Sequence, residues 1–170
     1  MTRKYLNDRY CVRCNRHTAT PYLRKHWNKL TPDIANAQIV DLGCGNGRNS
    51  NFLLEQGARW VLGVDMAADK RNNSLILGES ALPVDSDTID VFLANYIFMF
   101  LSPTERLQLI GEIKRTAHAD ATLMCELYPA KDSEAKTEEE MLELQKELFD
   151  QLNWEKVLFS KGRFLAKSIS

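Results

Sequence analysis

The stretch IVDLGCGNGR, residues 39–48, decides the fold of this chain. The apolar run at 38–42 breaks into a loop of three alternating glycines, and residues 49–56 have the pattern of a helix that ends at Gly57. Glycines after a buried strand let the backbone approach a ligand, and the following helix offers unpaired N–H groups. The order of strand, glycine loop and helix therefore predicts a nucleotide-like ligand at the end of this strand.

Short apolar runs follow the loop, each bounded by polar, proline or glycine residues, and they predict strands at 60–64, 75–77, 89–94 and 121–127. Two capping boxes predict the helices after the last two of these strands, and the residues concerned are Ser102 with Glu105 and Thr137 with Glu140. Residues at helical spacing are expected to face the core, namely Leu107, Ile110, Ile113 and Ala117 in the first helix, and Met141, Leu144, Leu148 and Leu152 in the second.

Residues 156–160 and 163–169 flank a Lys161-Gly162 turn and predict a hairpin. The chain is therefore an α/β protein with a Rossmann-like, doubly wound and mostly parallel sheet, a C-terminal antiparallel hairpin and three α/β/α layers. Only nine residues, 66–74, separate the second and third strands, which limits the helix between them to one or two turns.

Composition fits one soluble domain over residues 1–170, with 44% hydrophobic and 26% charged residues in a chain of 170. The chain has no run of 18 apolar residues, and its polar, basic N-terminal residues lack a secretory pattern, so we expect a cytoplasmic protein. Its four cysteines are too few for a disulfide framework.

Positive charge is concentrated at the start of the chain. The first 30 residues carry eight Lys or Arg against one acid, a local charge of +7, whereas the whole chain carries −1. We interpret residues 1–34 as a basic helical arm that faces either an anionic partner or the acidic body of the protein, and residues 35–170 as the core. Thr20-Pro21 begins a helix in this arm, with Leu23, Trp27 and Leu30 on one face.

Cys11, Cys14 and His17, with His26 further on, have spacings that zinc ligands use. They fall in one short basic stretch, whereas a structural zinc site usually pairs two separated knuckles. Packing on a helix face is the favoured interpretation, and no metal is expected.

The spacing of the glycines narrows the class of ligand. Gly43-x-Gly45-x-Gly47 differs from the G-x-G-x-x-G dinucleotide fingerprint and lacks the lysine of a P-loop, which disfavours pyrophosphate. Asp65 ends the second strand, 18 residues beyond Gly47, where a carboxylate can accept both ribose hydroxyls. The alternative role for Asp65 is a helix cap.

Residues 39–48 resemble the first motif of the class I S-adenosylmethionine-dependent methyltransferases. The resemblance implies that Asp41 lies near the methionine amino group of the cofactor, that the loop glycines let the cofactor pass, that Asp65 binds the ribose and that Met66 packs on adenine. The expected cofactor is S-adenosylmethionine, with S-adenosylhomocysteine as the product. The remaining expected contacts are Cys44 and Asn46 in the loop, Glu79 and Ser80 at the adenine edge, and Asn95 beside the methyl donor.

The resemblance covers roughly residues 35–170, and residues 78–101 are similar to the small-molecule branch of the family. The chain reads Ala94-Asn95-Tyr96-Ile97 where enzymes that methylate amino groups have an Asn/Asp-Pro-Pro-aromatic loop, and it has no Pro-Cys pair there. A small-molecule or accessible acceptor is expected, with Tyr22, His26 and Trp27 at the border of its pocket. Two alternatives stay open: an RNA or protein methyltransferase that uses the basic arm, and a non-catalytic cofactor-binding partner subunit.

Methyl transfer from a sulfonium mainly needs a nucleophile held in line, and a general base is needed only when the accepting atom is protonated. The candidate bases are Tyr96, Glu126, Tyr128 and, less favoured, His118. Three of them also have a purely structural interpretation. Tyr96 is then an aromatic of the core or rim, Glu126 a solvent-facing strand residue and His118 a cation at a helix C-terminus.

Overall fold

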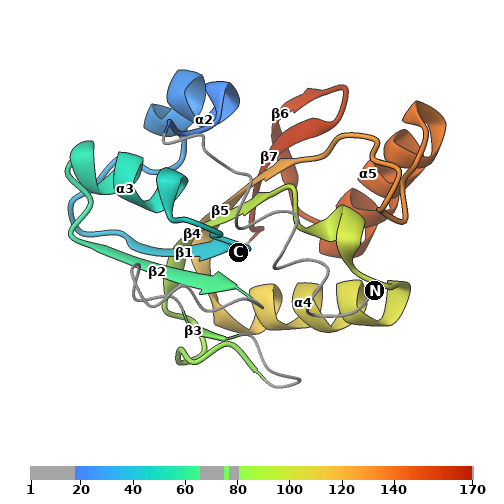
Figure 1. Ribbon diagram of the computed structural model, residues 1–170. Coiled ribbons are helices and arrows are strands. Elements are labelled where there is room, and N and C mark those ends of the chain that lie inside the picture. Colours follow the sequence, from blue (N-terminus) through green and yellow to red (C-terminus); the bar gives the residue numbers. More distant parts are fainter. Residues whose placement is uncertain (1–17, 66–74, 77–80, 170) are drawn as a thin grey trace.

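The computed structural model describes residues 18–65, 75–76 and 81–169, in which seven strands form one sheet (Figure 1). The strand order is β3-β2-β1-β4-β5-β7-β6. Neighbours from β3 to β5 are parallel, whereas β7 runs antiparallel to both β5 and β6. The strand bounds are β1 Gln38–Leu42, β2 Trp60–Asp65, β3 Leu75–Ile76, β4 Ile89–Asn95, β5 Ala117–Glu126, β6 Glu155–Ser160 and β7 Arg163–Lys167. The predicted mostly parallel sheet with a closing hairpin is confirmed.

Helices cover both faces of this sheet, with α2 and α3 on one side and α4 and α5 on the other (Figure 1). Their bounds are α2 Pro21–His26, α3 Arg48–Glu55, α4 Pro103–Thr116 and α5 Glu138–Leu152, and two short 3-10 turns span η2 Trp27–Lys29 and η3 Phe98–Phe100. Leu23 and Leu53 pack in one core cluster, and Ile113 and Leu148 pack in the other. The three-layer α/β/α arrangement is therefore confirmed. The crossover expected at 66–74 lies outside the described residues.

The helix starts follow from local chemistry. In α4 the Ser102 hydroxyl accepts a hydrogen bond from Glu105 N, and the Glu105 carboxylate accepts one from Ser102 N. Thr137 and Glu140 make the same reciprocal pair at the start of α5. Each box satisfies backbone donors that the first helical turn leaves unpaired, which is why both predicted starts are confirmed.

The predicted buried face of α4 is wrong at one position. Leu107 is 56% exposed, whereas its neighbour Arg106 is only 6% exposed. The Arg106 guanidinium donates to Leu101 O at 2.7 Å and pairs with Glu147 of α5, so its two terminal nitrogens are bonded while its aliphatic stem covers the core. Ile110 and Ile113 are buried as predicted; Ala117 is also buried, but as the first residue of β5. All four residues predicted to face the core from α5 are buried.

Strand register brings distant residues together at the carboxyl edge of the sheet. Asn95 at the end of β4 pairs with Glu126 at the end of β5, and Glu126 pairs with Arg163 at the start of β7. Asp41 of β1 pairs with Leu93, two residues before Asn95. Because alternate strand residues share a face, these polar side chains lie on the side covered by α2 and α3. No helix of the described part of the chain is long and apolar enough to cross a membrane.

Candidate functional site

The loop after β1 is built on left-handed glycines. Gly43, Gly45 and Gly47 have φ values of +68°, +54° and +75°, a region that other residues enter only with strain. The N–H groups of Gly43 and Cys44 donate to Val64 O at 2.7 and 3.1 Å. These bonds tie the loop to the carboxyl end of the neighbouring strand β2, so its shape is fixed before any ligand binds.

Space beside the loop differs from one glycine to the next. A Cβ on Gly43 would lie 3.0 Å from Ile97 Cδ1, whereas a Cβ on Gly45 would meet no atom within 4 Å. The sheet order reverses between β1 and β4, and ligands of open α/β sheets bind at such a switch point, outside the carboxyl ends of the strands. Gly45 therefore borders open space at the position where this fold binds ligands.

Asp65 at the end of β2 holds the loop. Its Oδ2 atom accepts a hydrogen bond from Gly45 N at 2.8 Å. This carboxylate thus links the end of β2 to the middle of the glycine loop, and its predicted ribose contact stays a prediction. Met66, Glu79 and Ser80, the other predicted contacts on the adenine side, lie outside the described residues.

Asp41 is a buried carboxyl group beneath the loop, 1% exposed, and Ser50 Oγ donates to its Oδ2 at 2.6 Å. Burial raises the pKa of Asp41 to about 6, although the Ser50 hydrogen bond acts in the opposite direction. A buried carboxylate is stabilised by a nearby cation or by further hydrogen-bond donors. Its environment therefore suits the ammonium group that the motif predicts there.

Two loop residues predicted to contact the cofactor have structural neighbours. Cys44 is buried, and its Sγ lies 2.9 Å from the position that a Cβ on Gly63 of β2 would take. Asn46 Oδ1 accepts from Arg48 N at 3.4 Å, at the start of α3. Their side chains support the loop, and cofactor contact by either stays a prediction.

Glu126 forms the centre of a second polar cluster, at the end of β5. Its side chain is fully buried, so the solvent-facing interpretation is wrong. Thr20 Oγ1 donates to Oε1, while Tyr96 OH and Arg163 Nε donate to Oε2 at 3.0 and 3.3 Å. A carboxylate that accepts three hydrogen bonds from three separate elements is held in place, so Glu126 acts best as a positioning residue.

Tyr96 follows β4 with φ of +65°, an uncommon conformation for a bulky residue, and its N–H donates to Glu126 O at 2.8 Å. Burial and the Glu126 carboxylate raise the pKa of Tyr96 to about 12. The phenol therefore stays protonated at neutral pH and donates a hydrogen bond, which argues against a role as general base. The ring of the exposed Tyr128 contacts the Tyr96 ring edge-on, with centroids 5.1 Å apart.

Asn95 carries an unsatisfied polar group at this edge. It is 7% exposed, and neither its amide oxygen nor its amide nitrogen has a hydrogen-bond partner within the described segments. A buried amide without partners costs free energy, and such a group in a native fold indicates a bound ligand or water. Asn95 lies directly across from Glu126, so the two polar clusters meet at this residue.

His118 is not part of the site. It lies near the start of β5, at the opposite end of the strand from Glu126, and forms an exposed 3.7 Å pair with Asp90. The expectation that it ends a helix is wrong, because α4 ends at Thr116 and His118 is a strand residue. Of the four predicted bases, Tyr96, Glu126 and Tyr128 therefore lie together at the carboxyl edge of the sheet, and His118 does not.

Three site residues were missed by the sequence interpretation, namely Thr20, Asn49 and Arg163. Thr20 N donates to Asn49 Oδ1 of α3 at 3.0 Å, and the Thr20 hydroxyl bonds Glu126. Thr20 therefore fastens the start of α2 to both α3 and β5. The Thr20-Pro21 pair predicted a helix start, but no local signal shows a contact between residues 106 positions apart.

A groove of about 360 Å³ lies between α2 and the β6–β7 hairpin. Tyr22 and His26 line it, whereas Trp27 does not, and their predicted place at the border of the acceptor pocket stays a prediction. Burial and the neighbouring Lys25 and Lys29 lower the pKa of His26. The groove opens at the same edge of the sheet as the Glu126 cluster, because Arg163 belongs to both.

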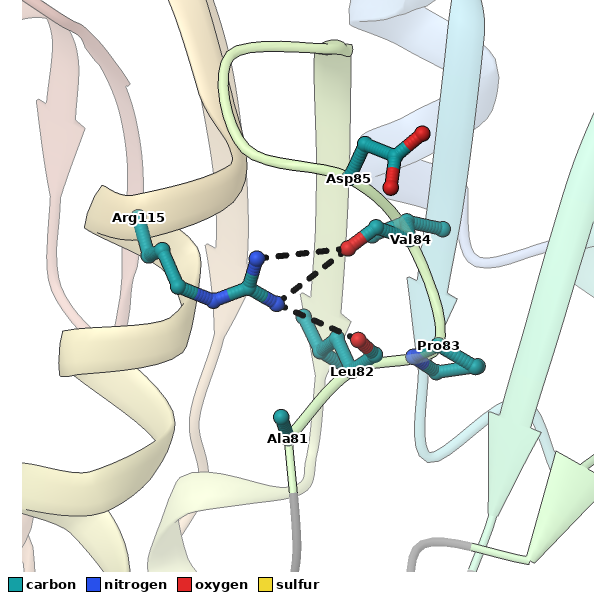
Figure 2. Close-up of a pocket in the computed structure, with 6 residues that line it drawn as sticks. All are labelled: Ala81, Leu82, Pro83, Val84, Asp85 and Arg115. Atoms are coloured by element: carbon teal, nitrogen blue, oxygen red, sulfur yellow. Dashed lines mark hydrogen bonds between the residues drawn. The ribbon is translucent and has the colours of Figure 1, made fainter.

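A second cavity, between residues 81–85 and Arg115, lies at the opposite edge of the sheet (Figure 2). Arg115 donates to Leu82 O and Val84 O and pairs with Glu112 at 2.7 Å. These bonds clamp the segment before β4 onto the last turn of α4, which is a structural role. Within the described residues no three His, Cys, Asp or Glu side chains form a group that would hold a metal, and Cys11, Cys14 and His17 lie outside them.

Comparison with known proteins identifies the family of this chain. Residues 40–125, half of the chain, match the family described as a methyltransferase domain. A tRNA U34 carboxymethyltransferase of Aliivibrio salmonicida is 29% identical over 102 residues, 49% of this chain and 32% of that protein. Phosphoethanolamine N-methyltransferase 1 of Caenorhabditis elegans is 31% identical over 96 residues, 49% of this chain and 20% of that protein. The chain thus spans a third or less of the length of these curated relatives.

Among solved structures, the 1,6-didemethyltoxoflavin-N1-methyltransferase of Burkholderia thailandensis, crystallised with 1,6-didemethyltoxoflavin and S-adenosylhomocysteine, is 18% identical with a TM-score of 0.70. The match covers 99% of this chain and 87% of that chain. At this identity the likeness shows a shared fold along the whole chain.

Proposed function

This chain belongs to the class I S-adenosylmethionine-dependent methyltransferases, and we propose that it transfers the cofactor's methyl group to a small-molecule acceptor. The family match confirms the methyltransferase family predicted from residues 39–48. The activity, the cofactor, the acceptor and the residues that contact them belong to the proposal.

One observation carries the cofactor side: an open, left-handed glycine loop at the switch point of the sheet, with a buried carboxylate beneath it. We assign the cofactor's amino group to Asp41 and its ribose to Asp65. The part of the cofactor between these two groups then lies along the backbone at Gly45. Bound there, S-adenosylmethionine supplies a sulfonium methyl, which is an activated electrophile. Asn95 would contact the cofactor or the acceptor with its unpaired amide.

On the acceptor side, the chain contributes positioning. Glu126 holds Thr20, Tyr96 and Arg163 in one network, so α2 is fixed over the carboxyl ends of β4 and β5. Excluding water and aligning a nucleophile are sufficient for in-line displacement when the acceptor atom is unprotonated. This arrangement favours an acceptor whose nucleophilic atom is unprotonated at neutral pH.

Isothermal titration calorimetry with S-adenosylmethionine and S-adenosylhomocysteine, with NAD as the control ligand, tests the cofactor site. We expect both sulfur compounds to bind and NAD not to bind, because the loop lacks the pyrophosphate fingerprint. Asp65→Ala should weaken S-adenosylhomocysteine by about tenfold, the loss of one or two hydrogen bonds to a charged group. Full affinity in Asp65→Ala would refute the ribose assignment, and no binding by the unaltered protein would favour the non-catalytic partner.

Transfer to RNA is the second candidate, because the described part of the basic arm places exposed Arg24, Lys25 and Lys29 on α2 and η2. RNA binding that weakens steeply with salt, and that is lost on deleting residues 1–17 together with these charges, would favour it over a small acceptor. Salt-insensitive or absent RNA binding would eliminate it.

A further inference from the structure

The groove between α2 and the β6–β7 hairpin combines cationic and aromatic walls. Lys25 of α2 and Arg163 of β7 supply the positive charge, because burial and neighbouring lysines lower the pKa of His26. Tyr22 and His26 add rings, Pro21, Leu158, Phe159 and Ser160 complete the lining, and none of the eight lining residues is acidic. A groove that has cations but no carboxylate on its walls complements an anion.

Arg163 is oriented for such a ligand. Its Nε donates to the buried Glu126 carboxylate, and its guanidinium lies over the Tyr22 ring, 5.8 Å from the centroid. The two terminal nitrogens have no hydrogen-bond partner in the described part of the chain, and 49% of the side chain is exposed. A guanidinium fixed along one edge still offers the paired N–H groups that bind carboxylate or phosphate in two-pronged fashion.

Tyr22 gives an independent indication of a ligand. It is only 8% exposed, and its hydroxyl has no hydrogen-bond partner among the described residues. The Tyr22 ring stands edge-on to the His26 ring, with centroids 4.8 Å apart. The rings of Tyr22 and His26 therefore form one aromatic pair on the α2 wall of the groove. A buried hydroxyl without a partner, beside this pair of rings, suits a flat ligand that carries a hydrogen-bonding group.

The groove is also at a suitable distance from the reaction centre. Arg163 is one strand away from Glu126, and Glu126 is one strand away from Asn95. Adjacent strands lie about 4.8 Å apart, so Arg163 and Asn95 are separated by roughly 10 Å, the length of a small aromatic compound. Arg163 and Tyr96 both donate to Glu126 Oε2, so a ligand on the free edge of Arg163 lies beside the network at the ends of β4 and β5.

We propose that this groove is the acceptor subsite and that it selects a compact aromatic compound bearing a phosphate or carboxylate group. The anion pairs with Lys25 and the free edge of Arg163, and the ring packs against Tyr22 and His26. This inference rests on the proposed function for the identity of the ligand as an acceptor, but the binding of an aromatic anion can be measured without methyl transfer.

Lys25 and Lys29 provide a matched pair of variants. Both are exposed and lie four residues apart on the same segment, but only Lys25 lines the groove. Calorimetry of the full chain with phenyl phosphate, benzoate, phenol and inorganic phosphate should give the tightest binding for an aromatic anion. We expect Lys25→Glu to weaken that binding by at least about tenfold and Lys29→Glu to change it by less than about twofold.

Equal losses in the two variants would overturn the subsite, because they would indicate a general effect of charge. Binding of phenol as tight as that of phenyl phosphate or benzoate, or no detectable binding of either anion, would also overturn it. S-adenosylhomocysteine is titrated into the same three proteins. If S-adenosylhomocysteine does not bind the unaltered chain, the proposed function is refuted. If S-adenosylhomocysteine still binds Lys25→Glu, that variant is folded.

Discussion

The two halves of the carboxyl edge are built in different ways. On the cofactor side, the glycine loop, Asp41 and Asp65 come from residues 41–65, and their bonds link the loop to its own strand–helix–strand unit. On the acceptor side, Thr20, Tyr96, Glu126 and Arg163 come from four separate segments. The first half is formed within one short stretch of sequence, whereas the second exists only when the sheet is complete. Substitutions should therefore separate the two halves by their effects on stability and on cofactor affinity.

The largest expected change in stability comes from Glu126→Ala. This variant removes the common acceptor of three donors in a buried network and should lower the free energy of unfolding by about 3 kcal/mol, discounted for the half-exposed Arg163. Urea denaturation measures the loss, with Glu143→Ala on the exposed face of α5 as the control. Affinity for S-adenosylhomocysteine should stay within about threefold. A parallel loss of cofactor affinity would show that the two halves are not independent.

Asp41→Asn should act in the opposite direction. The pKa of about 6 in the folded state lies above the ordinary aspartate value of 3.8, so the folded state binds more protons between these values and stability falls as pH rises through them. Asparagine is neutral and still accepts from Ser50, so the variant should be more stable by about 2 to 3 kcal/mol at pH 7.5. Its gain should shrink towards zero near pH 4.

Urea denaturation of both proteins at pH 4 and pH 7.5 measures this difference. S-adenosylhomocysteine affinity should fall about tenfold in Asp41→Asn, because the proposed partner of the cofactor's ammonium group loses its charge. A variant no more stable than the unaltered protein at pH 7.5 would show that burial of the Asp41 carboxylate is compensated.

Gly43→Ala tests the glycine loop. At φ +68° a Cβ costs about 1 to 2 kcal/mol, and here it would also lie 3.0 Å from Ile97 Cδ1. Gly111→Ala, in an open position of α4, is the matched control and should add about 1 kcal/mol. Thermal unfolding should shift in opposite directions in the two variants, and only Gly43→Ala should weaken cofactor binding. Shifts of the same sign would contradict the strained-loop interpretation.

The smallest effect is expected for Tyr96→Phe, which removes one hydrogen bond to Glu126 and should cost about 1 kcal/mol. A double-mutant cycle with Glu126→Gln isolates the coupling between the two side chains. Coupling near zero would mean that Tyr96 is held by its own strained backbone and by packing on Tyr128 instead of by the Glu126 carboxylate.

Sequence reasoning predicted the glycine loop and the helix starts because their signals are local. A left-handed turn requires glycine, and a helix start requires a hydroxyl with an acid three residues later, so residues 43–47, Ser102 and Thr137 carry their structural meaning within a few positions. Arg106 and Leu107 show the limit of this reasoning. Helical periodicity gives the width of a buried face, but packing against Leu101 and Glu147 decides which neighbour fills it.

The sequence by itself determined the order of strands and helices, the glycine loop with Asp41 and Asp65, and the family to which these residues belong. Only the tertiary structure decided that Glu126 is buried, that Thr20 and Arg163 bond to it, and that Asn95 is left without a partner. The physical reason is that burial and hydrogen-bond satisfaction depend on which strands become neighbours. That outcome is set by the free energy of the whole sheet and its two helical layers, and no short segment encodes it.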